Sequence, residues 1–241
     1  MLVKTKGIAL HQINYSDTSI ICYIYTEKYG KLNFLVKGAK RKNANIKANF
    51  FQPLFILELD IYYRSNKNFQ QIRELKYAPL LTNMANDMIK KSISLFIAEI
   101  LYRIIKEEEP NGALFGFISN SIQLLDHLDK NVINFHLFFL TRLTKFIGFL
   151  PENNYSARNC YFDLIKGKFD NNIPSHRHYM DKEITRVFAN ILSNTSHDYR
   201  IDLINNNIRT TILEKLIEYY QIHLEGFSNI KSLDVFKEIF R

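Results

Sequence analysis

Basic side chains without acidic neighbours are the feature of this sequence most suited to chemistry. Seven of them lie between Glu27 and Glu58, and no aspartate or glutamate interrupts them: Lys28, Lys31, Lys37, Lys40, Arg41, Lys42 and Lys47. Ammonium and guanidinium groups at this density can neutralise phosphates without reading bases. We therefore predict that the last five of the seven bind a nucleic-acid backbone; the alternative is a charged loop that only meets solvent.

The distribution of charge along the chain supports this prediction. Residues 1–80 hold 13 lysines and arginines against 5 acids, whereas residues 81–241 hold 19 against 19, so the whole net charge of +8 belongs to the first third. A codon bias toward lysine would scatter the surplus of positive charge along the whole chain. A surplus concentrated in one region indicates an anionic partner instead. Four more basic residues are expected to extend the patch: Lys4, Lys6, Arg64 and Lys67. Three aromatic residues are candidates for base stacking, with a core position as their alternative: Phe50, Phe51 and Tyr63.

Catalytic chemistry is not indicated by any motif. The sequence contains no GxxxxGK[ST], HExxH or GxSxG pattern, and the "KGAK" of residues 37–40 lacks the loop glycines and the hydroxyl of a phosphate cradle. The run Glu107, Glu108 and Glu109 at a predicted helix end is typical of a solvated face. We expect a protein that is not an enzyme and carries no cofactor.

Cys160, His176 and His178 are the residues of this sequence that could offer ligands to zinc. A structural zinc site needs four ligands, commonly from paired cysteines. The positions three residues from Cys160 hold Ala157 and Asp163 instead of cysteine. We therefore expect a surface loop with incidental histidines and no bound metal.

Two regions of different periodicity must position these residues. Up to about residue 77, short β-branched or aromatic runs alternate with turn-forming clusters, which predicts five strands and a small closed or partly closed barrel. Leu32, Phe34 and Val36 alternate with other residues and should face inward. The turn "EKYGK" should join the second and third strands as a hairpin.

The spacing of apolar residues becomes helical after Pro79. Helices are expected over residues 86–108, 112–128, 131–149, 181–194, 208–224 and 232–240. Residues 152–180 carry Asn, Asp, Gly, Pro and His and should form an irregular insertion. The predicted fold class is α+β, with a domain over residues 1–80 and an all-helical domain with a loop-rich insertion over residues 81–241.

Neither a secretory signal nor a membrane span is predicted. The N-terminus lacks a long apolar core, and the most apolar window, residues 132–150, is interrupted by His136, Arg142 and Lys145. That window predicts a buried helix. Cys22 and Cys160 are expected to be reduced thiols, so we expect a cytoplasmic protein with no membrane partner.

Several segments, in order, resemble the RecO family of bacterial recombination mediators. The N-terminal part contains "KGIAL", "YSDTS", a threonine and glycine around the first hairpin, and "KGAKRK". The resemblance continues in "FFQPLFILEL" at residues 50–59, in "FIGFLP" at residues 146–151, and in the spacing of Arg, Leu, His and Phe from Arg209 to Phe236. It covers nearly the whole chain. The sequence departs from the four-cysteine zinc module of many members, because only Cys160 and "YFDLIKGKF" remain.

The resemblance implies an OB-fold barrel followed by a helical domain, acting in recombinational DNA repair without an active site. Members bind single- and double-stranded DNA, anneal complementary strands, contact the acidic, Phe-ending C-terminal tail of single-strand binding protein, and work with RecR to load RecA. A nucleoid-associated location follows from these partners. Two other functions stay open from the residues alone: an RNA-binding OB-fold module, and a protein adaptor that uses its basic loop on an acidic partner.

The acidic tail, if bound, requires an apolar pocket with cations at its rim. The predicted helix over residues 131–149 offers Arg142 and Lys145 beside the rings of Phe139 and Phe146, with Phe138 and Leu143 as further walls. The alternative is that both cations only extend from a buried helix to solvent. We predict that this helix holds the peptide site.

Overall fold

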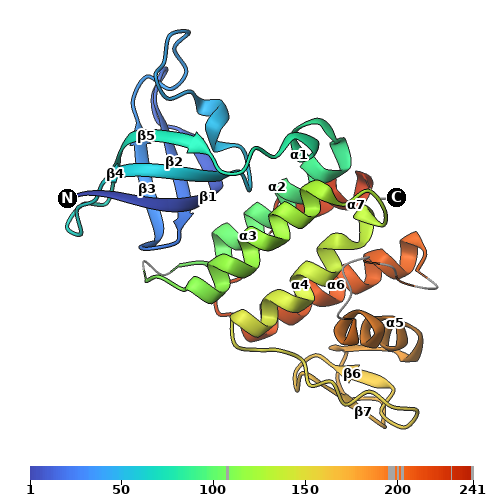
Figure 1. The fold of residues 1–241 in the computed structure, drawn as a ribbon. Helices are drawn as coiled ribbons and strands as arrows, with labels where there is room; N and C mark the ends of the chain where they lie inside the picture. The colour runs from blue at the N-terminus through green and yellow to red at the C-terminus, as the bar shows by residue number, and fades with distance from the viewer. Residues whose placement is uncertain (107–108, 195–198, 200, 202–203, 229, 240–241) are drawn as a thin grey trace. The chain divides into compact units, whose positions relative to one another are not determined.

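The N-terminal part of the chain forms a curved antiparallel sheet of five strands (Figure 1). The computed structural model describes residues 1–106, 109–194, 199, 201, 204–228 and 230–239. The sheet order is β3-β2-β1-β4-β5, and the strands are β1 (Leu2–Asn14), β2 (Ile20–Thr26), β3 (Gly30–Val36), β4 (Ile56–Tyr62) and β5 (Gln71–Tyr77). The edge strands meet at an isolated parallel bridge between Phe34 and Gln70, so the sheet is not fully closed and is consistent with an OB-fold.

The core of this sheet confirms the predicted inward face of β3. Leu32, Phe34 and Val36 are all buried, and the residues between them are half-buried. The predicted hairpin between β2 and β3 is present, with Gly30 at a positive φ of 64° at its end. A short 3-10 helix, η1 (Ala48–Phe51), was not expected; it places Phe51 in the core at 1% exposure.

The first helices share a compact unit with the sheet. This unit spans Met1–His127 and contains α1 (Thr82–Asn86), α2 (Met88–Ile104) and α3 (Gly112–His127). The Asp87 side chain caps α2 by accepting a hydrogen bond from the Lys90 amide. The Tyr25 hydroxyl donates to the Asn111 carbonyl at 3.2 Å and joins the sheet to the start of α3. The change from strands to helices falls near residue 80, but a domain boundary at that point stays a prediction.

The second compact unit spans Leu128–Arg241. Its helices, after the short η2 (Val132–Asn134), are α4 (Phe135–Phe146), α5 (Lys182–Ser193), α6 (Asn206–His223) and α7 (Ser232–Ile239). Helix α4 is buried along most of its length, as predicted, and the Tyr220 hydroxyl donates to the Leu140 carbonyl at 2.7 Å. With the sheet of the first unit, these helices confirm the α+β class.

The insertion over residues 152–180 is loop-rich, as expected, but it also contains strands. These are β6 (Tyr161–Asp163), β7 (Lys168–Asp170) and β8 (Tyr179–Met180), in the order β7-β6-β8. They are too short for a periodic pattern to be visible in the sequence. The Phe162 amide donates to the Thr185 hydroxyl at 3.1 Å, which attaches this small sheet to α5.

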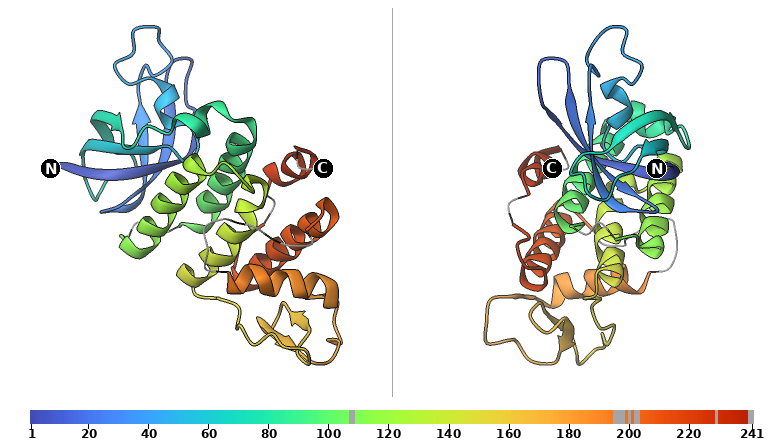
Figure 2. Two further views of the ribbon diagram at one scale, coloured as in Figure 1. Left: turned by 45° about the vertical axis from the view of Figure 1, so that its right-hand side comes forward. Right: turned by 90° about the vertical axis from the view of Figure 1, so that its left-hand side faces the viewer.

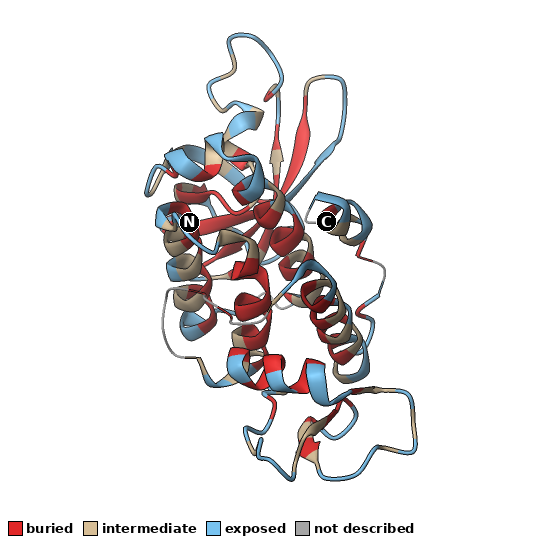
Figure 3. Cartoon of the chain, turned by 90° about the vertical axis from the view of Figure 1, so that its right-hand side faces the viewer, coloured by how far each residue is buried: buried red, intermediate tan, exposed pale blue. Residues whose placement is uncertain are grey.

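None of the helices in the described residues combines the length and apolar character needed to cross a bilayer. The inward sides of the helices are buried, whereas the segment that follows β3 is mostly exposed (Figure 3). Figure 2 shows this segment and the β1–β2 hairpin extending from the body of the sheet.

Candidate nucleic-acid interface

The segment of residues 37–47, which we call the basic loop, is anchored at both ends by its backbone. Gly38 adopts a positive φ of 71°, which favours glycine, and turns the chain away from β3. Ala39 is buried at 3% exposure. The Lys40 amide donates to the Thr18 carbonyl at 3.1 Å, and the Ala48 amide donates to the Ala39 carbonyl at 3.1 Å. The backbone is therefore held against the sheet.

All five predicted cations of the basic loop are exposed: Lys37, Lys40, Arg41, Lys42 and Lys47. Within the described part of the chain, none of them forms an ion pair with a carboxylate. Their positive charge therefore faces solvent without compensation, which suits binding of a polyanion.

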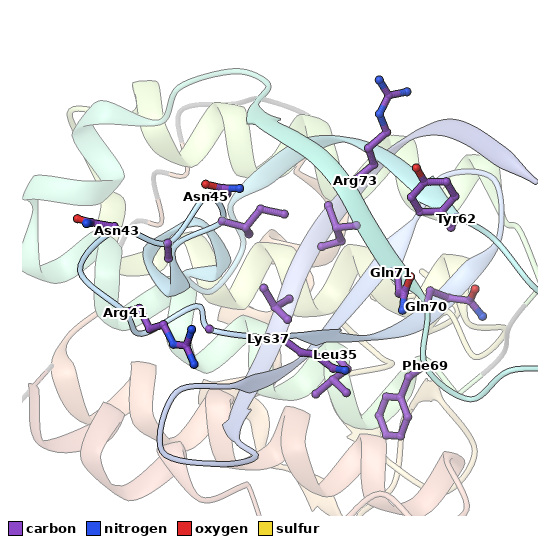
Figure 4. Close-up of a pocket in the computed structure, with 15 residues that line it drawn as sticks. Leu35, Lys37, Arg41, Asn43, Asn45, Tyr62, Phe69, Gln70, Gln71 and Arg73 are labelled. Atoms are coloured by element: carbon purple, nitrogen blue, oxygen red, sulfur yellow. The ribbon is translucent and has the colours of Figure 1, made fainter.

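A groove of about 570 Å³ lies between β3, the basic loop and the start of β5 (Figure 4). We call it the cationic groove. Apolar side chains contribute to its wall at Leu35, Val36 and Ile72. Its basic residues are Lys37, Arg41 and Arg73, and the described residues that line it include no acid. The structure thus brings two of the predicted cations, Lys37 and Arg41, into one groove and adds Arg73.

Arg73 lies at a β-bulge, and the sequence alone did not predict its place in the groove. The pairing of β4 with β5 passes from Asp60 opposite Glu74 to Ile61 opposite Ile72, which leaves Arg73 as the extra residue. A bulge redirects the side chain at its position and is common beside functional sites. The nearest carboxylate, on Glu74, is 3.8 Å away and largely exposed, so this ion pair neutralises Arg73 only weakly.

Two aromatic side chains at the same groove were also missed. Tyr62 is 45% exposed and Phe69 is 44% exposed, and both line the cationic groove. The sequence did contain a signal for each. Strand alternation means that Tyr62 and Tyr63 cannot both face inward, and Phe69 directly follows the polar turn at residues 65–68.

The three aromatic candidates for base stacking pack in or against the core of the sheet, which was their alternative. Phe51 is 1% exposed and offers no face to a base, so stacking is excluded for Phe51. Phe50 packs on Tyr77, with 4.7 Å between ring centroids. Tyr63 stacks on Tyr29 at 4.2 Å. Phe50 lies in η1, whereas Tyr63 directly follows β4, and both are half-buried.

Lys4 and Lys6 lie in a second groove, of about 500 Å³, on the exposed face of β1, β4 and β5. We call it the balanced groove, because its four lysines face four acids: Lys4, Lys6, Lys28 and Lys76, with Glu27, Glu58, Asp60 and Glu74. The Lys76 and Glu58 side chains are 2.7 Å apart, and this hydrogen bond lowers the pKa of Glu58 below its ordinary value. Lys4 lies 3.9 Å from Asp60.

Arg64 and Lys67 occupy the loop between β4 and β5 and line neither groove. Both are exposed. The buried Gln70 side chain holds this loop together, because it accepts from the Arg64 amide at 2.8 Å and donates to the carbonyls of Arg64 and Lys67 at 2.9 Å each. Their predicted contribution to binding stays a prediction.

The residues predicted to bind the acidic tail differ in their burial along α4. Phe139 is buried at 3% exposure and belongs to the core, as do Phe138 and Leu143. The Arg142 guanidinium donates to the Asn194 carbonyl at 3.0 Å and lies 5.6 Å from the centroid of the Tyr199 ring. Lys145 is exposed and Phe146 is half-buried. The peptide site on this helix stays a prediction.

The two histidines among the candidate metal ligands lie beside different carboxylates. The His176 Nε2 atom lies 3.3 Å from the Asp163 carboxylate, and the His178 Nδ1 atom lies 2.6 Å from Glu218. Cys160 is half-buried, and no three potential ligands converge anywhere in the described residues. Of the acidic run considered above, Glu107 and Glu108 lie outside the described residues, and Glu109 is exposed.

The fold and the groove define an OB-fold protein whose cationic groove is followed in the chain by a helical region. Residues 1–79 match the family model described as recombination protein O N terminal, and residues 85–234 match recombination protein O C terminal. The chain belongs to the RecO family. This confirms the resemblance inferred from its motifs.

Similar proteins align with the chain from end to end. Proteins called DNA repair protein RecO are 36% identical over 241 residues in Azobacteroides pseudotrichonymphae, 38% over 242 residues in Bacteroides fragilis and 33% over 242 residues in Flavobacterium psychrophilum. In each case the alignment covers 100% of both chains.

Proposed function

We propose that this protein is a non-enzymatic, DNA-binding mediator of recombinational repair, and that the basic loop and the cationic groove hold single-stranded DNA. The observation that carries the proposal is a set of exposed cations with no acid in the described lining of the groove. Membership of the RecO family supports a role in DNA repair and recombination. Flexible ammonium groups on an anchored loop neutralise phosphates whatever the base sequence.

The finer activities belong to the same proposal. By holding single strands without reading their sequence, the protein would anneal complementary strands and help to load RecA, together with RecR, onto DNA coated by single-strand binding protein. Duplex DNA would bind through the same phosphates. Contact with the acidic tail of single-strand binding protein, and a cytoplasmic, nucleoid-associated location, complete the proposal. The cations of the second unit support the tail contact only in part, because Arg142 already donates to the Asn194 carbonyl.

Charge reversal in the basic loop tests the proposal. Replacing Lys40, Arg41 and Lys42 by Glu should abolish most single-strand binding in fluorescence anisotropy. If five phosphates are neutralised in the parent protein, log K against log salt concentration should have a slope of about −3.5, at about −0.7 per contact. A matched variant reverses two lysines and one arginine that are exposed outside the groove: Lys91, Lys130 and Arg158. Equal losses in the two variants would show that only total charge matters.

Three probes separate the proposal from its alternatives. They are single-stranded DNA, RNA of the same sequence, and an acidic peptide that ends in Phe. Preference for RNA would favour an RNA-binding module, since phosphates alone do not distinguish the two sugars. Binding of the peptide alone, lost on loop reversal, would favour a protein adaptor.

A further inference from the structure

One end of the cationic groove is lined by two aromatic side chains that are partly exposed to solvent. Tyr62 and Phe69 lie where β4 leaves the groove and β5 enters it, and Figure 4 shows Gln70 and Gln71 between them. More than two fifths of each side chain is exposed. Among the described residues, neither ring stacks on another aromatic side chain. Exposed aromatic rings in a cationic groove are suited to stacking on bases.

One cation of the groove comes from the same strand end. Arg73 lines the groove with Tyr62 and Phe69, and it is the extra residue of the β-bulge in β5. Its side chain is 46% exposed, and within the described part of the chain its guanidinium pairs with one carboxylate, that of Glu74, at 3.8 Å. A planar guanidinium can contact two phosphate oxygens at once, which fixes a backbone more firmly than an ammonium does.

Rings and cations respond differently to single and double strands. Both kinds of DNA offer phosphates, so the basic loop alone distinguishes them poorly. In a duplex each base face is covered by its neighbours, and a protein ring reaches it only after unstacking. In a single strand the bases can be splayed out onto aromatic side chains.

We propose that Tyr62 and Phe69 stack on unpaired bases, that Arg73 binds the phosphate beside them, and that this end of the groove makes the protein prefer single strands. The inference rests on the proposed function, since it assigns a specificity to the same groove. These residues would provide the preference for single strands, whereas the basic loop would provide affinity for DNA of either kind.

The test uses the full chain with Tyr62→Ala, Phe69→Ala and the double variant. The probes are a thymidine oligomer, a duplex of the same length, and an abasic strand of the same length. Each ring removed should weaken binding of the thymidine oligomer by about five- to 150-fold, the equivalent of losing one stacked base. Binding of the duplex should change by no more than about twofold. On the abasic strand, the parent and the double variant should bind equally.

Controls separate stacking from loss of structure. Tyr155→Ala truncates an aromatic residue of similar exposure, 38%, in the second unit and should leave binding unchanged. Phe69→Trp keeps a ring and should restore binding. Arg73→Ala should make the salt slope shallower by about 0.7, and Arg73→Lys should recover it. Melting temperatures show how much stability each truncation costs, since a little more than half of each ring is buried, and Phe69→Trp separates that cost from the loss of stacking.

The possible outcomes are distinct for the two proposals. Equal losses on single strands and duplex, or no loss on either, would overturn the stacking proposal and leave phosphate binding by the basic loop intact. A normal affinity in the Lys40, Arg41 and Lys42 reversal, together with a loss in the ring variants, would instead overturn the role of the basic loop. Unequal binding of parent and double variant to the abasic strand would also overturn stacking.

Discussion

The cationic groove holds three basic residues and no acid among its described lining residues, whereas the balanced groove holds four lysines and four acids. The groove with more lysines is therefore the one with less net charge. The cause lies in strand register, because Lys4 is opposite Asp60 and Lys6 is opposite Glu58 on neighbouring strands. A carboxylate beside a lysine both occupies its ammonium and repels a phosphate. Attraction for a polyanion thus depends on which charges share a face.

The cationic groove escapes this compensation for a structural reason. Most of its cations come from a loop that follows β3, and a loop has no cross-strand neighbour to place a carboxylate opposite each lysine. Arg73, its one basic residue on a strand, sits at a bulge and is left out of the regular pairing. The cationic groove is therefore built where the sheet is irregular.

Charge reversal in matched pairs gives the largest expected difference between the two grooves. Lys37→Glu with Arg41→Glu should weaken single-strand binding by about 100-fold or more, since each of the two lost charge-assisted contacts costs about 1.5–3 kcal/mol. Lys4→Glu with Lys6→Glu makes the same change in total charge and should weaken binding by only about twofold. Anisotropy titrations in low salt measure both.

Equal weakening of binding by the two pairs of substitutions would contradict the proposed difference between the grooves. So would a larger effect of the pair in the balanced groove, because DNA would then follow the exposed face of β1, β4 and β5. Thermal melting checks that neither pair unfolds the sheet.

Removing acids from the balanced groove should produce a smaller, opposite change. Glu58→Gln with Asp60→Asn leaves four lysines facing two acids, so the groove becomes net positive. We expect binding of single strands to strengthen by about two- to fivefold in low salt, with a steeper salt slope. Glu225→Gln with Asp234→Asn, in the second unit, makes the same change in total charge and should not alter the slope.

Much of this molecule could be predicted from sequence because strand and helix periods are set by burial. The alternation at Leu32, Phe34 and Val36 fixed an inward face that the structure confirms. The concentration of charge at residues 37–47 likewise located the exposed basic loop. Such properties depend on neighbours in the chain, which the sequence displays directly.

The rest depends on neighbours across strands, which the sequence does not display. Nothing local distinguishes Lys4, which faces Asp60, from Lys37, which has no carboxylate opposite. A bulge at Arg73 follows from how two strands pair, and the core position of Phe51 follows from a short 3-10 helix. Strands β6 to β8 contain two or three residues each, too few for periodicity.

The smallest expected effect concerns the ion pair that neutralises the balanced groove. A hydrogen bond from the Lys76 ammonium, with the charges of Lys76, Lys6 and Lys4, lowers the pKa of Glu58. A lowered pKa in the folded state means that the ionised carboxylate stabilises the fold above the pKa of the unfolded chain. This stabilisation is lost as the pH falls through the lowered pKa. Lys76→Met should therefore raise the pKa of Glu58 and slightly reduce the difference in melting temperature between neutral and acidic solution.

The pKa of Glu58 in this variant can be followed by NMR titration of its side-chain carboxyl carbon. Lys67→Met removes an exposed lysine that lines neither groove, and it should leave that pKa unchanged. The Lys76 side chain is largely exposed and that of Glu58 is half-exposed, so the effect on unfolding should be small beside the effects on DNA binding. An unchanged pKa in Lys76→Met would mean that Lys76 does not hold Glu58 ionised. The neutrality of the groove would then come from charges that offset one another without direct pairing.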